Sequence, residues 1–218
     1  MTETARATSS TFASAPMRRF LLTVFVLAAC GSPDTPAEPE APAPPTAPAP
    51  PETSDARPGQ KEGTISVEGM DQPVALRLVR EADFPIPFST YVPEEMGYDT
   101  VASGEGSAAR FSLGAEPREA VLSVFVPSGG VDDLDAWARE AAETMGEPSQ
   151  LEPPAWAEAA YSFGGVDRMG AVLAGRHAGR PFYVLESLPL NMGDGFGPRA
   201  AAVQREWRWL DDGSGLTR

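Results

Sequence analysis

The stretch Ala120-Val121-Leu122-Ser123-Val124-Phe125-Val126 governs the fold prediction, because it is apolar almost throughout. A strand with one face in solvent alternates apolar and polar residues, whereas a strand of this composition is covered on both faces. The sequence therefore places residues 120–126 inside a sheet that has packed layers on either side.

Further strands are predicted on both sides of this stretch, from short apolar runs bounded by turn residues. Residues 63–67 and 74–79 form a predicted β-hairpin around a Gly-, Asp- and Pro-containing turn. The prolines within residues 84–93 forbid a central strand there but allow an edge strand or an extended lead-in. The other predicted strands are 98–103, 107–113, 157–163, 168–176 and 181–188, the last two joined by a hairpin turn around residues 177–180.

The first predicted helix covers residues 131–145, where apolar side chains recur at spacings of three and four. Asp132, Asp133 and Asp135 fall in its first turn and face the positive end of the helix dipole. Acidic clusters also bind calcium, but the alternating ligands and closing glutamate of a calcium loop are missing from this stretch. We therefore expect helix capping here rather than a metal site.

The second predicted helix covers residues 198–210, because Pro198 stands where proline favours a helix start and apolar residues then recur at helical spacing. A glycine-rich loop is predicted just before it, at residues 191–197. This loop is a candidate wall of a ligand pocket.

Four residues of this region are candidate binding residues. Asp194 in the glycine-rich loop either contacts a ligand or satisfies backbone donors near the helix start. Phe196 and Trp207 belong to the apolar stripe of the predicted helix, whereas Trp209 lies off that stripe. Tryptophan is enriched at binding hot spots, so an interface role stands beside core packing, which we favour.

These elements predict an α+β fold, a three-layer α/β/α sandwich around an antiparallel sheet. The stretch Phe88-Ser89-Thr90-Tyr91-Val92-Pro93-Glu94-Glu95-Met96 resembles the Phe-Ser…Val-Pro-Glu-Gly-Trp motif of PsbP-like proteins. The resemblance covers residues 84–210, with Met96 in place of the tryptophan and an extra hairpin before the motif. It implies the same three-layer sandwich and an accessory or binding role rather than an enzymatic one.

The N-terminal segment resembles a bacterial lipoprotein signal. Arg18 and Arg19 precede an apolar run at 20–29, which is too short to cross a bilayer but suits an export signal. The run ends in Leu27-Ala28-Ala29-Cys30, which resembles a lipobox and contains the only cysteine of the chain. A short buried strand or helix that happens to end in cysteine is the alternative.

The resemblance implies that Cys30 becomes the mature N-terminus and carries the lipid that binds the bilayer. One acyl chain binds a membrane marginally, whereas several anchor a protein stably. Gly31 and Ser32 are not the acidic residue that favours retention at the inner membrane, so we expect attachment to the outer membrane, facing the periplasm, in a source with two membranes. Translation starts at either Met1 or Met17.

Three segments follow from this interpretation. Residues 1–29 are the predicted signal peptide, residues 30–59 a lipidated cysteine and a disordered Pro/Ala-rich tether, and residues 60–218 a single globular domain. The tether contains almost nothing large and apolar, so it cannot bury enough surface to fold. Its prolines favour an extended spacer of roughly 80 Å at full stretch.

The chain is acidic, with 17 Lys and Arg against 31 Asp and Glu. Without residues 1–29 the balance is 14 against 30, a net charge of −16. Nucleic-acid binding depends on Lys and Arg, so we expect no nucleic-acid partner.

Few residues offer catalytic chemistry. His177 is the only histidine and Lys61 the only lysine, which argues against a multi-histidine metal site and a Ser-His-acid triad. No nucleophile elbow or phosphate-binding loop is present, and we expect no cofactor and no metal. The sequence predicts a non-enzymatic lipoprotein that binds a protein partner or assists an assembly in the cell envelope. The alternatives are a small-ligand binding lipoprotein and an unrecognised hydrolase.

Overall fold

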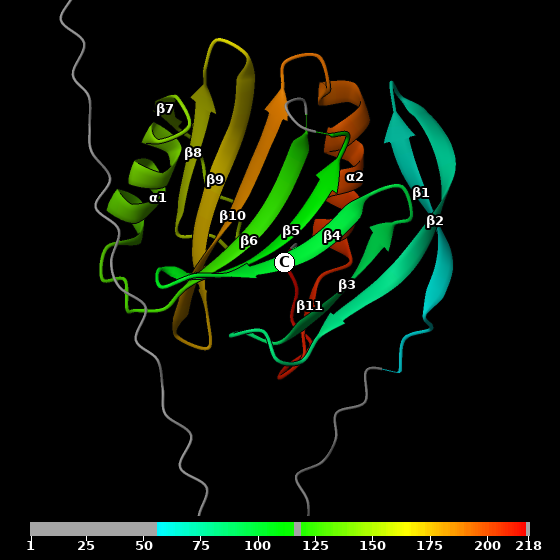
Figure 1. Ribbon diagram of the computed structural model, residues 1–218, viewed down its shortest axis with the longest axis horizontal. Coiled ribbons are helices and arrows are strands. Elements are labelled where there is room, and N and C mark those ends of the chain that lie inside the picture. Colours follow the sequence, from blue (N-terminus) through cyan, green and yellow to red (C-terminus); the bar gives the residue numbers. More distant parts are fainter. Residues whose placement is uncertain (1–55, 116–118, 217–218) are drawn as a thin grey trace, which may run out of the picture. The chain divides into compact units, whose positions relative to one another are not determined.

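In the computed structural model, which describes residues 56–115 and 119–216, the strand at 120–126 is the third of seven in an antiparallel sheet (Figure 1). The apolar strand is thus an inner strand of this sheet, although Phe125 on its outer face is only half-buried. The sheet order is β4 (Gly97–Ala102), β5 (Gly106–Leu113), β6 (Ala120–Pro127), β10 (Arg180–Pro189), β9 (Arg168–His177), β8 (Ala159–Gly164) and β7 (Glu147–Gln150).

A second, four-stranded antiparallel sheet contains the N-terminal hairpin and the end of the chain. Its order is β1 (Gln60–Val67), β2 (Met70–Glu81), β3 (Phe88–Pro93) and β11 (Arg208–Trp209). The predicted hairpin is confirmed, and its turn is tighter than expected, because Glu68 and Gly69 alone turn the chain with φ of 52° and 77°.

The helix α1 (Leu134–Glu143) covers one face of the seven-stranded sheet, here called the outer face, at the end formed by β7, β8 and β9 (Figure 1). Leu134, Ala138 and Ala142 are buried there against apolar residues of β8 and β9. Capping by aspartate is confirmed, because the Asp133 side chain accepts a hydrogen bond of 2.9 Å from the backbone N–H of Ala136.

The helix α2 (Gly193–Arg205) lies on the opposite, inner face and also packs against the second sheet. It contacts β10 on one side and β1 and β3 on the other. The Thr90 hydroxyl in β3 donates a buried hydrogen bond of 2.7 Å to the carbonyl oxygen of Val203. Phe196, Ala200 and Val203 belong to the main core cluster, together with inward-facing residues of β5, β6 and β10.

The predicted three-layer α/β/α sandwich is wrong. The described chain is mostly β, with two antiparallel sheets and two helices in a sandwich-like arrangement. The inner face of the main sheet is covered by the four-stranded sheet together with α2, not by a helical layer alone. The fold implied by the PsbP-like resemblance is therefore overturned with it.

The physical reason is that the segment before β4 builds its own sheet. The prolines of residues 84–93 were expected to confine that stretch to an edge or a lead-in, yet β3 lies between β2 and β11. Pro85 and Pro87 precede the strand and Pro93 ends it, so the residues between them are free to pair on both sides.

The second helix also differs from its prediction. It begins at Gly193, inside the predicted glycine-rich loop, and ends at Arg205 instead of continuing to residue 210. Residues 208–209 form the short strand β11, which pairs with the start of β3. The strands β7 and β11 were not predicted, because four residues and two residues are too short to show an apolar period.

Candidate ligand-binding groove

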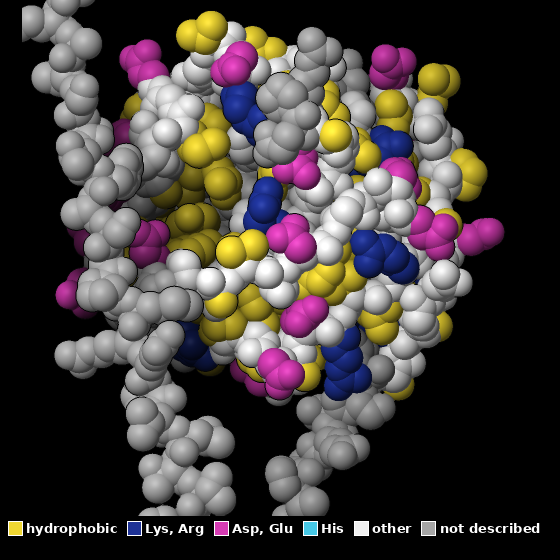
Figure 2. Space-filling view, in the orientation of Figure 1, with side chains coloured by type: hydrophobic (Ala, Val, Ile, Leu, Met, Phe, Trp, Pro, Cys, Tyr) yellow, Lys and Arg dark blue, Asp and Glu magenta, His cyan; other side chains and the backbone are white. Residues whose placement is uncertain are grey.

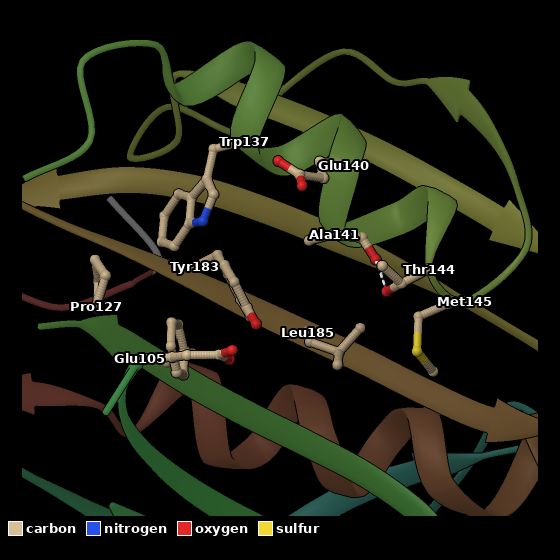
Figure 3. Close-up of a pocket in the computed structure, with 10 residues that line it drawn as sticks. Glu105, Pro127, Trp137, Glu140, Ala141, Thr144, Met145, Tyr183 and Leu185 are labelled. Carbon is tan, nitrogen blue, oxygen red and sulfur yellow. Dashed lines mark hydrogen bonds between the residues drawn. The ribbon is translucent and has the colours of Figure 1, made fainter. Parts of the chain in front are cut away.

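A groove of about 520 Å³ lies on the outer face of the seven-stranded sheet, between α1 and the strands β6 and β10 (Figure 3). We call it the α1 groove. In the space-filling view, hydrophobic side chains gather in a hollow on this side of the molecule (Figure 2). The lining residues are Glu105, Phe125, Pro127, Trp137, Glu140, Ala141, Thr144, Met145, Tyr183 and Leu185.

One wall of the groove is a face of α1 and the turn that follows it. Trp137, Ala141 and Met145 are spaced by four residues, which places their side chains one above another along the helix. The deeper residues of the same helix, Ala138 and Ala142, anchor it to the sheet. The apolar face of α1 is therefore wider than the part that packs on the sheet. Its remaining apolar side chains are half-buried and border the groove.

The floor of the groove comes from two neighbouring strands. Tyr183 in β10 is paired directly with Phe125 in β6, and cross-strand partners point to the same face of a sheet. Leu185 lies two residues further along β10, so its side chain also points to the outer face. A side chain at Gly106 would collide with Phe125, so this glycine leaves the space that the ring occupies.

Three aromatic rings form a cluster at one end of the groove. The ring centroids of Trp137 and Tyr183 are 4.8 Å apart, and those of Phe125 and Tyr183 are 5.1 Å apart. Phe125 and Trp137 are separated by 6.3 Å. Figure 3 shows the indole of Trp137 extending from α1 toward Tyr183, so the helix and the sheet each contribute to one aromatic surface.

Two carboxylates border this aromatic cluster. Glu140 extends from α1, and Glu105 comes from the turn between β4 and β5 (Figure 3). The turn is held in place because the backbone N–H of Ser128 donates to the Glu105 carbonyl oxygen at 2.8 Å, and the Ser128 hydroxyl donates to the Gly104 carbonyl oxygen at 2.7 Å. Within the described part of the chain, neither carboxylate takes part in an ion pair.

The environment of the groove changes the pKa of Tyr183. Burial raises the pKa of its hydroxyl, and the negative charge of Glu105 raises it further. The tyrosine is therefore neutral at physiological pH and keeps a hydroxyl group that can donate. No lysine or arginine is among the lining residues, so the groove is negatively charged at neutral pH.

The structure places the predicted binding residues away from this groove. Phe196 and Trp207 are completely buried in the core on the inner face, and Trp209 is 2% exposed. Core packing accounts for all three. Asp194 lies in the first turn of α2, and its side chain is outside the described part of the structure. Cys30 lies outside the described residues as well.

His177 forms a separate polar cluster at the end of the β9–β10 hairpin. Its Nε2 atom lies 2.8 Å from a carboxylate oxygen of Asp211, and its ring stacks on Trp209 with centroids 4.8 Å apart. Asp212 is close enough for the three side chains to bring ligand atoms within 4.8 Å of one another. Because the Nε2 atom of His177 already contacts Asp211, we interpret this cluster as a structural contact that holds the C-terminal segment against the hairpin, and not as a metal site.

Sequence reasoning missed most of the α1 groove. Trp137, Ala141 and Met145 fall in the predicted helix at 131–145 and Tyr183 in the predicted strand at 181–188, but the sequence does not bring the two elements together. The sequence contains only a partial indication of the groove. The apolar face of α1 is wider than the surface that the helix buries against one end of the sheet, so some apolar side chains are left to line a groove. Glu105 could not be found this way, because its place depends on the pairing of β4, β5 and β6.

Comparison with known proteins does not identify a family for this chain. No family model matches the chain, and neither the curated proteins nor the solved structures contain a significant match. Neither of the two described helices is long and apolar enough to cross a membrane.

Proposed function

We propose that this chain is a lipid-anchored, non-enzymatic binding protein of the cell envelope whose domain holds a small ligand in the α1 groove. The observation that carries the proposal is the groove itself, which combines three clustered aromatic rings with two carboxylates that form no ion pair with any described residue. Its volume of about 520 Å³ lies within the range of small-molecule sites, roughly 300–1,000 Å³.

The composition of the lining favours binding over catalysis. Aromatic and aliphatic side chains provide the contact area, and a few polar groups fix the orientation of a ligand. The lining residues include no histidine, cysteine or lysine that could act as a nucleophile or a base near neutral pH. The only titratable groups among them are Glu105, Glu140 and Tyr183, and the tyrosine is held in its neutral form.

The ligand-binding role is tested by thermal-shift screening of the purified protein against organic cations, organic anions and neutral compounds. A ligand present at 100 times its Kd stabilises the folded state by about 2.7 kcal/mol, which raises Tm by several degrees. The Ala141→Trp variant fills the groove, so it should lose this response. Ala136→Trp places the same side chain on the exposed side of α1 and serves as the matched control.

The result expected is a compound that stabilises the wild-type protein and the Ala136→Trp variant but not the Ala141→Trp variant. A compound that stabilises all three equally binds elsewhere and argues against the groove. If no compound of the three classes raises Tm, the proposed function is wrong.

The lipid anchor is the second part of the proposal and rests on the lipobox-like sequence that ends at Cys30. Cells that express the chain and grow with an alkyne-tagged fatty acid should label it, and the Cys30→Ala variant should remain unlabelled. Fractionation should place the labelled protein with the membranes. Equal labelling of the two proteins would contradict the anchor without affecting the ligand-binding role.

Protein binding is a second candidate function, favoured by exposed apolar side chains at one end of the main sheet. Val166 is 99% exposed and Leu190 is 55% exposed. They are brought together because the backbone N–H of Leu190 donates to the carbonyl oxygen of Asp167 at 3.1 Å. A photo-crosslinking residue at position 166 should capture one envelope protein that the same residue at the exposed position 143 does not. Identical products from both positions would exclude this surface.

A further inference from the structure

We propose that the ligand of the α1 groove is a small organic cation that carries a fully alkylated ammonium group, such as a trimethylammonium. This inference rests on the proposed function and narrows it to one chemical class. Three features of the groove support it: its charge, its aromatic surface and the lack of a lysine or arginine among the described residues that line it.

The charge of the groove selects for a cation. Glu105 and Glu140 border the same hollow, and none of the described residues that line it is a lysine or an arginine. Arg139, which precedes Glu140 in α1, is directed to Glu143 instead, at 3.6 Å on the exposed side of the helix. The two carboxylates thus lack a counter-charge within the described residues, and an anionic ligand would be repelled by both.

The aromatic cluster favours a cation that has no N–H groups and therefore donates no hydrogen bonds. The faces of aromatic rings carry negative potential, and cations are attracted to them within about 6 Å of the ring centroid. Trp137, Tyr183 and Phe125 pack against one another with centroids 4.8–6.3 Å apart, so an alkylated ammonium group would lie against the free side of this cluster rather than between the rings, within reach of more than one of them. A fully alkylated ammonium is weakly hydrated, and its methyl groups fit an apolar surface better than a primary amine does.

A metal ion does not fit the same surface. Metal ions of the hard type need several oxygen ligands at close range, and aromatic rings supply none. Among the described residues, a group of three metal-ligating side chains occurs around His177 and not in the α1 groove. The volume of about 520 Å³ also exceeds what an ion or a trimethylammonium head alone would fill, so the rest of the ligand lies along Leu185 and Met145.

The test measures binding by isothermal titration calorimetry, with tetramethylammonium and choline as cationic probes. The neutral isostere 3,3-dimethyl-1-butanol has the shape of choline without its charge, and ethanolamine has the charge without the methyl groups. We expect choline to bind at least tenfold more tightly than either control. The choline affinity should fall as the salt concentration rises, because the carboxylates are near the surface.

Variants separate the contributions of charge and rings. Glu105→Gln and Glu140→Gln should each weaken choline binding several-fold and leave the neutral isostere unaffected. Trp137→Leu keeps an apolar side chain but removes the ring, and it should weaken choline binding at least tenfold. Glu143→Gln removes a carboxylate from the exposed side of the same helix and is the matched control, expected to leave binding unchanged.

The alkylated ammonium group could belong to a free solute or to a lipid headgroup. Vesicles of phosphatidylcholine that sediment the protein, and lose it when choline is added, identify the headgroup as the source. Choline binding without sedimentation identifies a free solute.

The outcomes distinguish this inference from the proposed function. If the cationic probes bind no more tightly than 3,3-dimethyl-1-butanol, the cation inference is wrong. The ligand-binding role still stands in that case, provided that another compound stabilises the wild-type protein and not the Ala141→Trp variant. If no compound behaves in that way, both proposals fail.

Discussion

The indole ring of Trp207 stacks on the ring of Phe88, with centroids 4.0 Å apart and planes inclined by 13°. Trp207 follows α2 directly, and Phe88 begins β3, so the contact joins the C-terminal part of the chain to the second sheet. Phe111 of β5 touches the same indole edge-on at 6.2 Å, which links both sheets through one side chain.

Replacement of Trp207 should therefore destabilise the whole domain. We expect Trp207→Ala to lower the free energy of unfolding by about 3–5 kcal/mol, the usual cost of emptying a large aromatic site. Trp207→Phe should cost less, because it keeps a ring and removes an indole N–H that has no hydrogen-bond partner within the described structure. Urea denaturation followed by circular dichroism measures both. Equal losses for the two variants would show that stacking is not the main contribution.

Gly170 in β9 should not tolerate a side chain. A Cβ atom there would collide with the carbonyl oxygen of Glu186 and with the ring of Phe163. We expect Gly170→Ala to cost about 1–3 kcal/mol, as overpacking does in other cores. Gly164→Ala, at the end of the adjacent strand β8, meets nothing within 4 Å and is the control. The prediction fails if the two variants have the same denaturation midpoint.

The contribution of the N-cap of α1 to stability can be measured by substitution of Asp133. Asp133→Ala removes the side chain that accepts from the Ala136 N–H, and we expect a loss of about 1 kcal/mol of stability. Asp133→Asn keeps an acceptor and should lose only a fraction of that amount. Because α1 forms one wall of the groove, hydrogen exchange should also show faster opening of its first turn in the alanine variant.

Glu186 should make stability depend on pH. Its side chain is partly buried, and this burial raises the pKa of the carboxyl in the folded state. The folded protein therefore binds more protons than the unfolded chain between the unfolded pKa and the raised folded pKa, so stability falls as the pH rises through that window. Glu186→Gln cannot ionise and should be more stable than the wild type at neutral pH.

The advantage of Glu186→Gln should disappear below about pH 4, where the wild-type carboxyl is protonated in both states. Thermal denaturation at a series of pH values measures the difference. Glu152→Gln at an exposed position is the control and should show no such trend. A constant difference between Glu186→Gln and the wild type at all pH values would contradict the prediction.

The local elements were largely predictable from the sequence, because their signals are local. The apolar run at 120–126, the spacing of apolar residues in α1 and the turn at residues 177–180 each depend on neighbours in the chain. Ala178 and Gly179 adopt φ of 47° and 78° at that turn, as a tight hairpin requires.

The layers were not predictable, because they depend on pairings between distant segments. Nothing near Arg208 and Trp209 indicates that these residues pair with Ser89 and Phe88. The same pairing ends the second helix at Arg205, because the backbone of residues 208–209 is extended and hydrogen-bonded to β3. The α1 groove was missed for a related reason: Glu105, Trp137 and Tyr183 come from three separate elements.

The point where the chain joins the domain lies on the side of the second sheet. Arg57 donates a hydrogen bond of 2.9 Å to the carbonyl oxygen of Glu206 and another to the hydroxyl of Ser89, and Lys61 forms an ion pair of 2.8 Å with Glu206. The α1 groove opens on the outer face of the seven-stranded sheet, whereas the second sheet packs on its inner face. The contacts of Arg57 and Lys61 and the mouth of the groove thus lie on opposite faces of the domain, so a ligand can enter the groove without disturbing these contacts.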